Sequence, residues 1–142
     1  MGYPKVLVPV SGKFRLERAA RALEHALQIV REDGEIDFIH CVDDVPYLIT
    51  VEDHRKQYMQ DTSEAEKLFS PLVDRVRNAG ITCSVHIMEG SPVAHIPSFA
   101  AAKKFNIVVM CTDGDAESDK LAMGSIAARV FHYLDVPLLI VH

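Results

Sequence analysis

Residues 5–30 of the chain read KVLVPVSGKFRLERAARALEHALQIV, and this stretch decides the fold. Residues 6–10 are apolar throughout, which is typical of a strand buried on both faces of a parallel sheet. After a turn at Ser11 and Gly12, apolar residues recur at helical spacing as far as Val30, and Gly34 follows where such a helix would end. The stretch therefore predicts the first strand and the crossover helix of a βαβ unit.

The alternation of apolar strands and helical stretches continues along the rest of the chain. We expect further strands at residues 36–42, 81–88, 106–111 and 137–142. Further helices are expected at residues 61–80, from Pro92 onward and at residues 123–134, with a loop over residues 43–60 and either a kink or a restart at Pro71. The pattern predicts an α/β fold, a single domain over residues 1–142 with one open five-stranded parallel sheet and helices on both faces.

The composition excludes several classes of partner. The 142 residues are 49% hydrophobic and 25% charged, and their formal net charge is -5 at pH 7. This acidic balance gives nucleic acid and anionic membrane surfaces no general attraction, and no apolar run approaches the roughly 20 residues that span a bilayer. Three cysteines without CxxC spacing and the lack of a secretory leader favour a cytoplasmic protein. The seven histidines show no metal-ligand spacing, so no metal site is predicted.

One glycine-containing segment near the end of the chain is suited to binding an anion. Nine residues separate Gly114 from Gly124 and Ser125, which open the last expected helix. Glycines let backbone N–H groups approach a phosphate closely, and a helix start adds unpaired donors together with the Ser125 hydroxyl. The alternative is that Gly124 and Ser125 serve only as a helix N-cap. The sequence contains neither the P-loop motif nor the dinucleotide-binding motif.

Four further segments, taken with the first strand and helix, form a pattern of motifs along the chain. They are Gly90-Ser91-Pro92, IVVM at residues 107–110, GSIAARV at 124–130 and VPLLIV at 136–141. Together they resemble the universal stress protein family over residues 3–142. The resemblance implies a Rossmann-like sheet of the adenine-nucleotide alpha-hydrolase-like type, with strand order 3-2-1-4-5. It also implies a homodimer that pairs the final strands of two chains, and a role in stress tolerance. One branch of this family binds ATP and another does not.

The resemblance carries the family's ATP crevice onto nine positions of this chain: Pro9, Val10, Ser11, Val42, Met110, Gly114, Gly124, Ser125 and Ile126. Two departures from the family pattern weaken this site. Ser11 stands where the family usually has Asp, so a charge-assisted contact is lost. Cys111 stands at the first glycine of the signature G-x2-G-x9-G-[ST], where a side chain obstructs the ligand or the loop.

The loop beside the expected phosphate site is itself acidic. It carries four acids against one base, the acids being Asp113, Asp115, Glu117 and Asp119. Like charges near a phosphate cost on the order of 1 kcal/mol each at surface-like dielectric. Binding of ATP is therefore expected to be weak or lost unless Mg²⁺ bridges these acids and the phosphates.

We therefore expect a non-catalytic, homodimeric stress-response factor with a partly degenerate adenine-nucleotide crevice. The alternatives are a genuine ATP-binding protein that hydrolyses ATP slowly, and a module that binds an unknown protein partner and no nucleotide. No catalytic residue is predicted, because no pairing of a nucleophile with a base is recognisable. Cys111 is either a small buried hydrophobe or a redox-sensitive thiol, and about 10 Å separates it from Cys41 across the intervening strand, too far for a disulfide.

Overall fold

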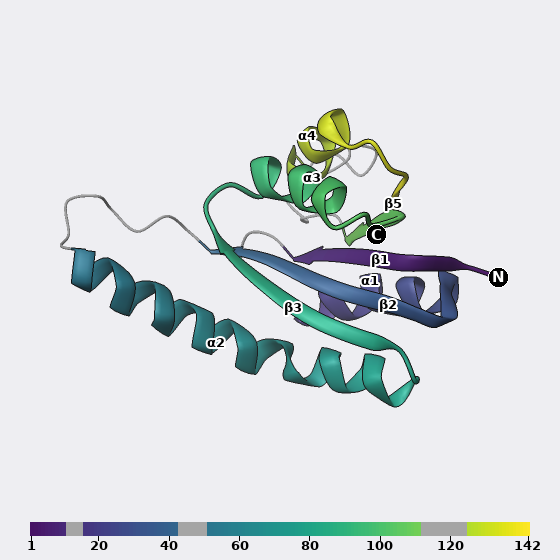
Figure 1. The fold of residues 1–142 in the computed structure, drawn as a ribbon, viewed down its shortest axis with the longest axis horizontal. Coiled ribbons are helices and arrows are strands. Elements are labelled where there is room, and N and C mark those ends of the chain that lie inside the picture. Colours follow the sequence, from purple (N-terminus) through teal and green to yellow (C-terminus); the bar gives the residue numbers. More distant parts are fainter. Residues whose placement is uncertain (11–15, 43–50, 112–124) are drawn as a thin grey trace.

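Five parallel strands form one sheet with the order β3-β2-β1-β4-β5 (Figure 1). The computed structural model describes residues 1–10, 16–42, 51–111 and 125–142. The strands are β1 (Tyr3–Val10), β2 (Val30–Val42), β3 (Thr82–Glu89), β4 (Ile107–Cys111) and β5 (Leu138–Val141). The helices are α1 (Leu16–Ile29), α2 (Val51–Asn78), α3 (Pro92–Ala102) and α4 (Ser125–Tyr133). The predicted α/β architecture and strand order are confirmed.

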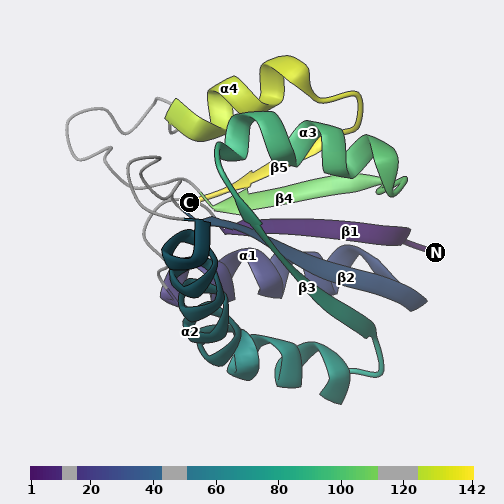
Figure 2. The same ribbon diagram turned by 60° about the vertical axis from the view of Figure 1, so that its left-hand side comes forward.

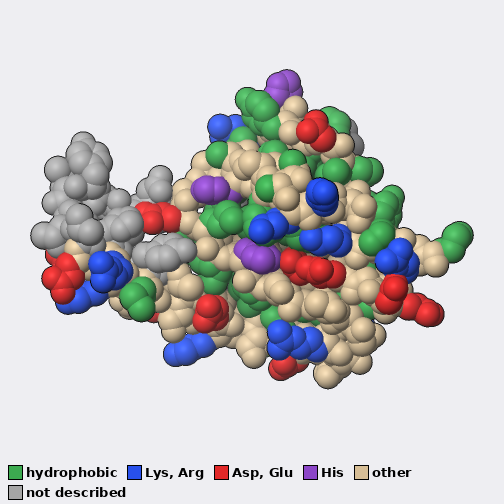
Figure 3. All heavy atoms as spheres, viewed as in Figure 1, with side chains coloured by type: hydrophobic (Ala, Val, Ile, Leu, Met, Phe, Trp, Pro, Cys, Tyr) green, Lys and Arg blue, Asp and Glu red, His purple; other side chains and the backbone are tan. Residues whose placement is uncertain are grey.

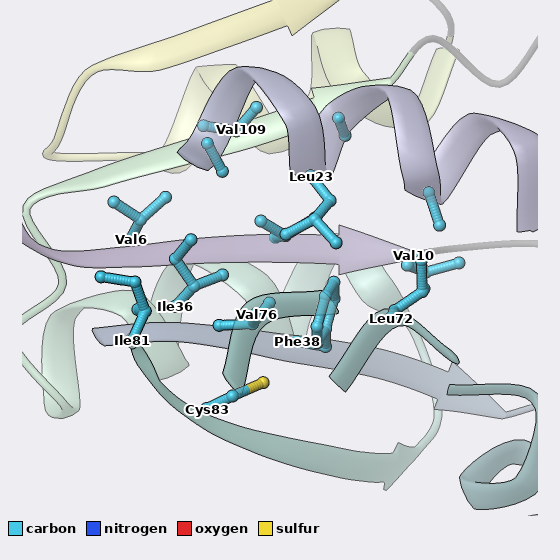
Figure 4. Close-up of a cluster of buried hydrophobic side chains, with 14 of the residues drawn as sticks. Val6, Val10, Leu23, Ile36, Phe38, Leu72, Val76, Ile81, Cys83 and Val109 are labelled. Atoms are coloured by element: carbon cyan, nitrogen blue, oxygen red, sulfur yellow. The ribbon is translucent and has the colours of Figure 1, made fainter. Parts of the chain in front are cut away.

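The helices lie in two layers, with α1 and α2 on one face of the sheet and α3 and α4 on the other (Figures 1 and 2). Side chains of the central strand β1 pack against both helical layers. Val6 and Val8 pack towards α1 and α2, whereas Leu7 packs towards α3 and α4, and all three are fully buried. Successive side chains of a strand point to opposite faces, so a strand between two helical layers must be apolar at every position. Figure 4 shows part of the larger core, with Leu23 of α1 above β1.

Helix α2 differs from the sequence-based prediction. It begins at Val51, so residues 51–60 are helical rather than part of a loop. Of the kink and the restart expected at Pro71, the restart is wrong, because one helix runs through this residue. Pro71 is exposed, while Phe69 and Leu72 beside it are buried against the sheet, so packing holds the helix together despite the lost hydrogen bond. The first turns of α2 extend past the strands, which explains their weak apolar pattern (Figure 1).

Gly34 also has a different role from the predicted one. The helix α1 ends at Ile29, and Gly34 lies inside β2 rather than at a helix end. A Cβ atom at Gly34 would lie 2.8 Å from Cγ2 of Val30 and 2.9 Å from the carbonyl oxygen of Pro4. The register between β1 and β2 shifts at this place, so the two backbones approach too closely for a side chain.

Candidate functional site

The strand order reverses between β1 and β4, and the carboxyl ends of these strands form the candidate site. Strands β2 and β3 lie on one side of β1, and β4 and β5 lie on the other. The pairing of β1 with β2 extends to Val10, opposite His40, whereas its pairing with β4 covers Val6 and Leu7. The described ladder between β1 and β4 therefore ends before β1 does, and Pro9, beyond it, has no backbone N–H to donate. Ligands of open parallel sheets bind at such a switch point.

Five of the nine predicted site residues come to this end of the molecule: Pro9, Val10, Val42, Met110 and Ile126. They do not share one surface. Val10 packs towards α1 and α2, while Met110 and Ile126 belong to the core under α3 and α4. Figure 2 shows α4 beginning at the same edge at which the labelled C-terminus of the chain lies.

The remaining predicted site residues lie outside the described part of the chain. These are Ser11, Gly114 and Gly124, together with the acidic segment 113–119. Ser125 is the first residue of α4, as predicted, but its side chain is outside the description as well. The predicted anion-binding loop therefore rests on the sequence alone.

His40 is a residue of this edge that the sequence analysis did not single out. It is only 8% exposed, its Nδ1 lies 2.7 Å from the carbonyl oxygen of Val10, and its ring centroid lies 6.0 Å from that of Phe69 in α2. The signal in the sequence is a polar residue inside the otherwise buried stretch of β2 that ends at Val42. A buried polar side chain is retained only where it finds a hydrogen-bond partner.

The ends of β2 and β3 are also held by hydrogen bonds from outside the ladder. The backbone N–H of Gly90 donates to the carbonyl oxygen of Val42 at 2.9 Å. Nε2 of His95, in α3, lies 2.8 Å from the carbonyl oxygen of Glu89. The carboxyl edge of the sheet is thus bound to the segment that opens α3.

A cluster of ionisable side chains occupies the opposite face of β2. The carboxylate of Asp37 accepts the backbone N–H of Ser84 at 3.2 Å and lies 2.9 Å from Nε2 of His86. Burial, together with the nearby Asp37, raises the pKa of the Glu35 carboxyl. Figure 3 shows acidic, basic and histidine side chains gathered on this side of the molecule. Within the described ranges, no group of three or more His, Cys, Asp or Glu side chains is arranged to hold a metal ion.

The model of the universal stress protein family matches residues 2–142. The chain belongs to this family. It is 26% identical to "Universal stress protein MJ0531" of Methanocaldococcus jannaschii over 142 residues, which cover 98% of this chain and 82% of the relative. The solved hypothetical protein MJ0577 is 22% identical and has a TM-score of 0.82, with 99% of this chain and 96% of that chain covered.

Some of the solved structures with this fold hold adenine nucleotides. The universal stress protein from Archaeoglobus fulgidus in complex with dAMP has a TM-score of 0.68 and 21% identity, and the match covers 100% of both chains. Two other similar structures are described as complexes with cAMP and with AMP. These likenesses establish the fold of the present universal stress protein. In the part of it that is described, no helix has the length and the apolar character to cross a membrane.

None of the three cysteines of this universal stress protein forms a disulfide. Burial raises the pKa of Cys41 to about 11, and burial with the nearby negative charge of Asp37 raises that of Cys83 to about 12. Cys111 is partly exposed at the end of β4, and β1 lies between it and Cys41 as predicted. Thiols with such raised pKa values stay protonated at neutral pH, so Cys41 and Cys83 are poor nucleophiles.

Proposed function

We propose that this universal stress protein is a stress-response factor that binds an adenine nucleotide at the carboxyl ends of β1 and β4 and acts by binding rather than by catalysis. The observation that carries the proposal is the reversal of the strand order between β1 and β4, whose carboxyl ends lie at the edge at which α4 begins. The adenine nucleotides held by similar structures support the choice of ligand.

The proposed site is partly degenerate towards ATP. Ser11 offers no carboxylate for a charge-assisted contact, and Cys111 places a side chain where the family signature has glycine. The four acids of residues 113–119 repel a triphosphate more than a monophosphate, because the triphosphate carries more negative charge. We therefore expect AMP to bind more tightly than free ATP, and Mg²⁺ to recover part of the loss.

The first experiment is a measurement of the nucleotide that copurifies with the protein, followed by calorimetric titration with AMP, ATP, ATP with Mg²⁺, and GTP as a control for the base. The proposal expects AMP to bind most tightly and GTP to bind least. If none of these nucleotides binds at millimolar concentration, the alternative of a partner-binding module without nucleotide replaces the proposal.

A double substitution tests the two departures from the family pattern. Ser11→Asp with Cys111→Gly is expected to strengthen ATP binding about tenfold, because it restores one charge-assisted contact and removes one obstruction. Ser63→Asp, which adds the same charge at an exposed position of α2, is the matched control and leaves affinity unchanged. An unchanged ATP affinity of the double variant would show that these two residues are not what weakens the site.

The absence of catalysis is also a proposal, and slow ATP hydrolysis is its alternative. Incubation of the protein with excess ATP and Mg²⁺, with phosphate release followed over hours, decides between them. Turnover that exceeds one phosphate per chain and scales with protein concentration favours the hydrolytic alternative.

We further propose a cytoplasmic homodimer that forms through β5. β5 lies at the edge of the sheet. On α4, which shares a hydrophobic core with β5, Phe131 and Tyr133 are 59% and 63% exposed. An apolar edge strand is a surface that pairs readily with a second copy. Light scattering after size exclusion is expected to give a dimer, and Phe131→Glu with Tyr133→Glu a monomer. Met59→Glu on α2, where the side chain is 63% exposed, is the control that stays dimeric.

A further inference from the structure

His40 is one of two buried polar side chains in the described part of the chain, the other being Asp37. Its Nδ1 lies 2.7 Å from the carbonyl oxygen of Val10. A carbonyl oxygen can only accept a hydrogen bond, so Nδ1 carries a proton and donates it. The contact therefore selects one arrangement of the imidazole ring and ties β2 to the last residue of β1.

The position of this hydrogen bond gives it a consequence for the candidate site. β1 is paired with β4 at Val6 and Leu7, so on that side the ladder does not reach the end of the strand. On the other side the described pairing reaches Val10 and His40, the two residues that the side-chain bond also joins. The ring of His40 is in turn packed against Phe69, which is fully buried in α2. Packing of the ring limits where its N–H can point.

We propose that His40 is a positioning residue of the nucleotide site, which holds the carboxyl end of β1 in place where an adenine nucleotide binds. This inference rests on the proposed function for the ligand, and it adds the residue that fixes the geometry of the site. A pre-positioned strand end lowers the ordering cost of binding. Loss of the bond therefore raises the dissociation constant even where the fold survives.

His95 provides an internal comparison. Its Nε2 lies 2.8 Å from the carbonyl oxygen of Glu89, so it binds the end of β3 as His40 binds the end of β1. β2 separates β3 from β1 and from the switch point. A change at His95 removes the same kind of hydrogen bond at a strand end that the proposed ligand does not touch.

Three variants of the full chain separate a hydrogen-bonding role from a packing role. The amide N–H of an Asn lies two bonds beyond Cβ, as does Nδ1 of His, so His40→Asn keeps a donor near the Val10 carbonyl. His40→Phe keeps a ring against Phe69 and removes the donor. Titrated with AMP, His40→Asn is expected to bind within about twofold of the wild type, His40→Phe about 2- to 10-fold more weakly, and His95→Phe unchanged.

The opposite order overturns the inference. If His40→Phe binds AMP as the wild type does and His40→Asn binds more weakly, then packing of the ring, and not the hydrogen bond, determines the affinity for AMP. Where His40→Phe does not fold, His40→Gln takes its place, because its amide lies one bond further from Cβ and misses the carbonyl. Equal weakening by His95→Phe would also overturn the inference, since it would make the effect a general one.

A spectroscopic measurement keeps the inference separate from the proposed function. The ¹⁵N shifts of the His40 ring are expected to show a protonated Nδ1, and amide exchange at the end of β1 is expected to rise in His40→Phe and not in His40→Asn. A wild type that binds no adenine nucleotide overturns the proposed function, and the positioning role falls with it. An unprotonated Nδ1 overturns the anchoring role even where AMP binds.

Discussion

Asp37 and His40 lie three residues apart on β2, and the alternation of the strand turns them to opposite faces of the sheet. Both side chains are buried, but their hydrogen-bond partners differ in kind. Asp37 is held by a neighbouring strand through Ser84 and by the ionisable ring of His86. His40 is held by the main-chain carbonyl of Val10 at the candidate site. The first arrangement joins side chains of two neighbouring strands, whereas the second fixes the backbone where we propose that a ligand binds.

The largest expected effect on stability comes from the aromatic residues that pack against His40 and against His86. Phe69 is fully buried against Phe38 and His40, so Phe69→Ala is expected to lower the free energy of unfolding by about 4 kcal/mol. Phe99, which contacts His86 and is 8% exposed, is the matched position on the other face, and Phe99→Ala is expected to cost less. Urea unfolding measures both. An equal or larger loss at Phe99 would contradict the expectation that the more deeply buried ring contributes more to stability.

Removal of the Asp37 carboxylate comes next in size. Asp37→Ala leaves the Ser84 N–H and the His86 ring without their acceptor, so we expect a loss of about 2 kcal/mol at pH 7. Asp37→Asn keeps an acceptor and is expected to cost less. Asp33→Ala on the same strand removes an exposed carboxylate paired with Arg31 and serves as the control, with no measurable loss expected. If Asp37→Ala lowers the free energy of unfolding no more than Asp33→Ala does, then the hydrogen bonds of Asp37 do not stabilise the fold, and the contrast drawn with His40 fails.

Glu35→Gln removes an ionisable carboxyl beside Asp37. It is expected to raise the stability, whereas Asp37→Ala lowers it. Because burial and Asp37 raise the pKa of Glu35, folding favours its protonated form, and stability falls as the pH rises from the unfolded value of 4.5 through the raised one. Glu35→Gln removes this fall and is expected to stabilise the protein at pH 7 by on the order of 0.5 kcal/mol, after allowance for solvent screening. Thermal unfolding is measured at pH 4 and pH 7. A gain that is equal at both pH values would argue against a charge effect.

The smallest expected effect is on thiol reactivity. Asp37 contributes to the raised pKa of Cys83, whereas burial alone raises that of Cys41. Asp37→Asn is therefore expected to increase the alkylation rate of Cys83 a few-fold at pH 9 and to leave Cys41 unchanged. Mass spectrometry of the labelled peptides distinguishes the two thiols. Parallel changes at both would indicate local opening of the sheet instead of a charge effect.

Labelling also addresses Cys111. It is partly exposed, so it is expected to react first in the native protein at pH 8. Rapid reaction would favour the redox-sensitive interpretation, and slow reaction would leave Cys111 as a packing residue.

The parts of the fold that the sequence predicted are those in which packing follows a regular period. Residues of β1 are apolar because both faces are covered, and the strand order agrees with that implied by the family resemblance. The first turns of α2 were missed because they contact little of the sheet and carry ion pairs such as Glu52 with Lys56 in place of an apolar stripe. Gly34 was misread because a close approach of two backbones leaves no periodic signal.

The candidate site divides in the same way. Its nine residues were assigned from the family resemblance, and five of them lie at one edge because the carboxyl ends of parallel strands meet there. His40 was not, because one polar residue in an apolar strand does not reveal which distant carbonyl it binds. By itself the sequence determined the layers, the strands and the family, since each is written in local patterns of residue type. Only the tertiary structure decided that the imidazole of His40 holds Val10 and the carboxylate of Asp37 holds His86, because such contacts depend on register and face across separate strands.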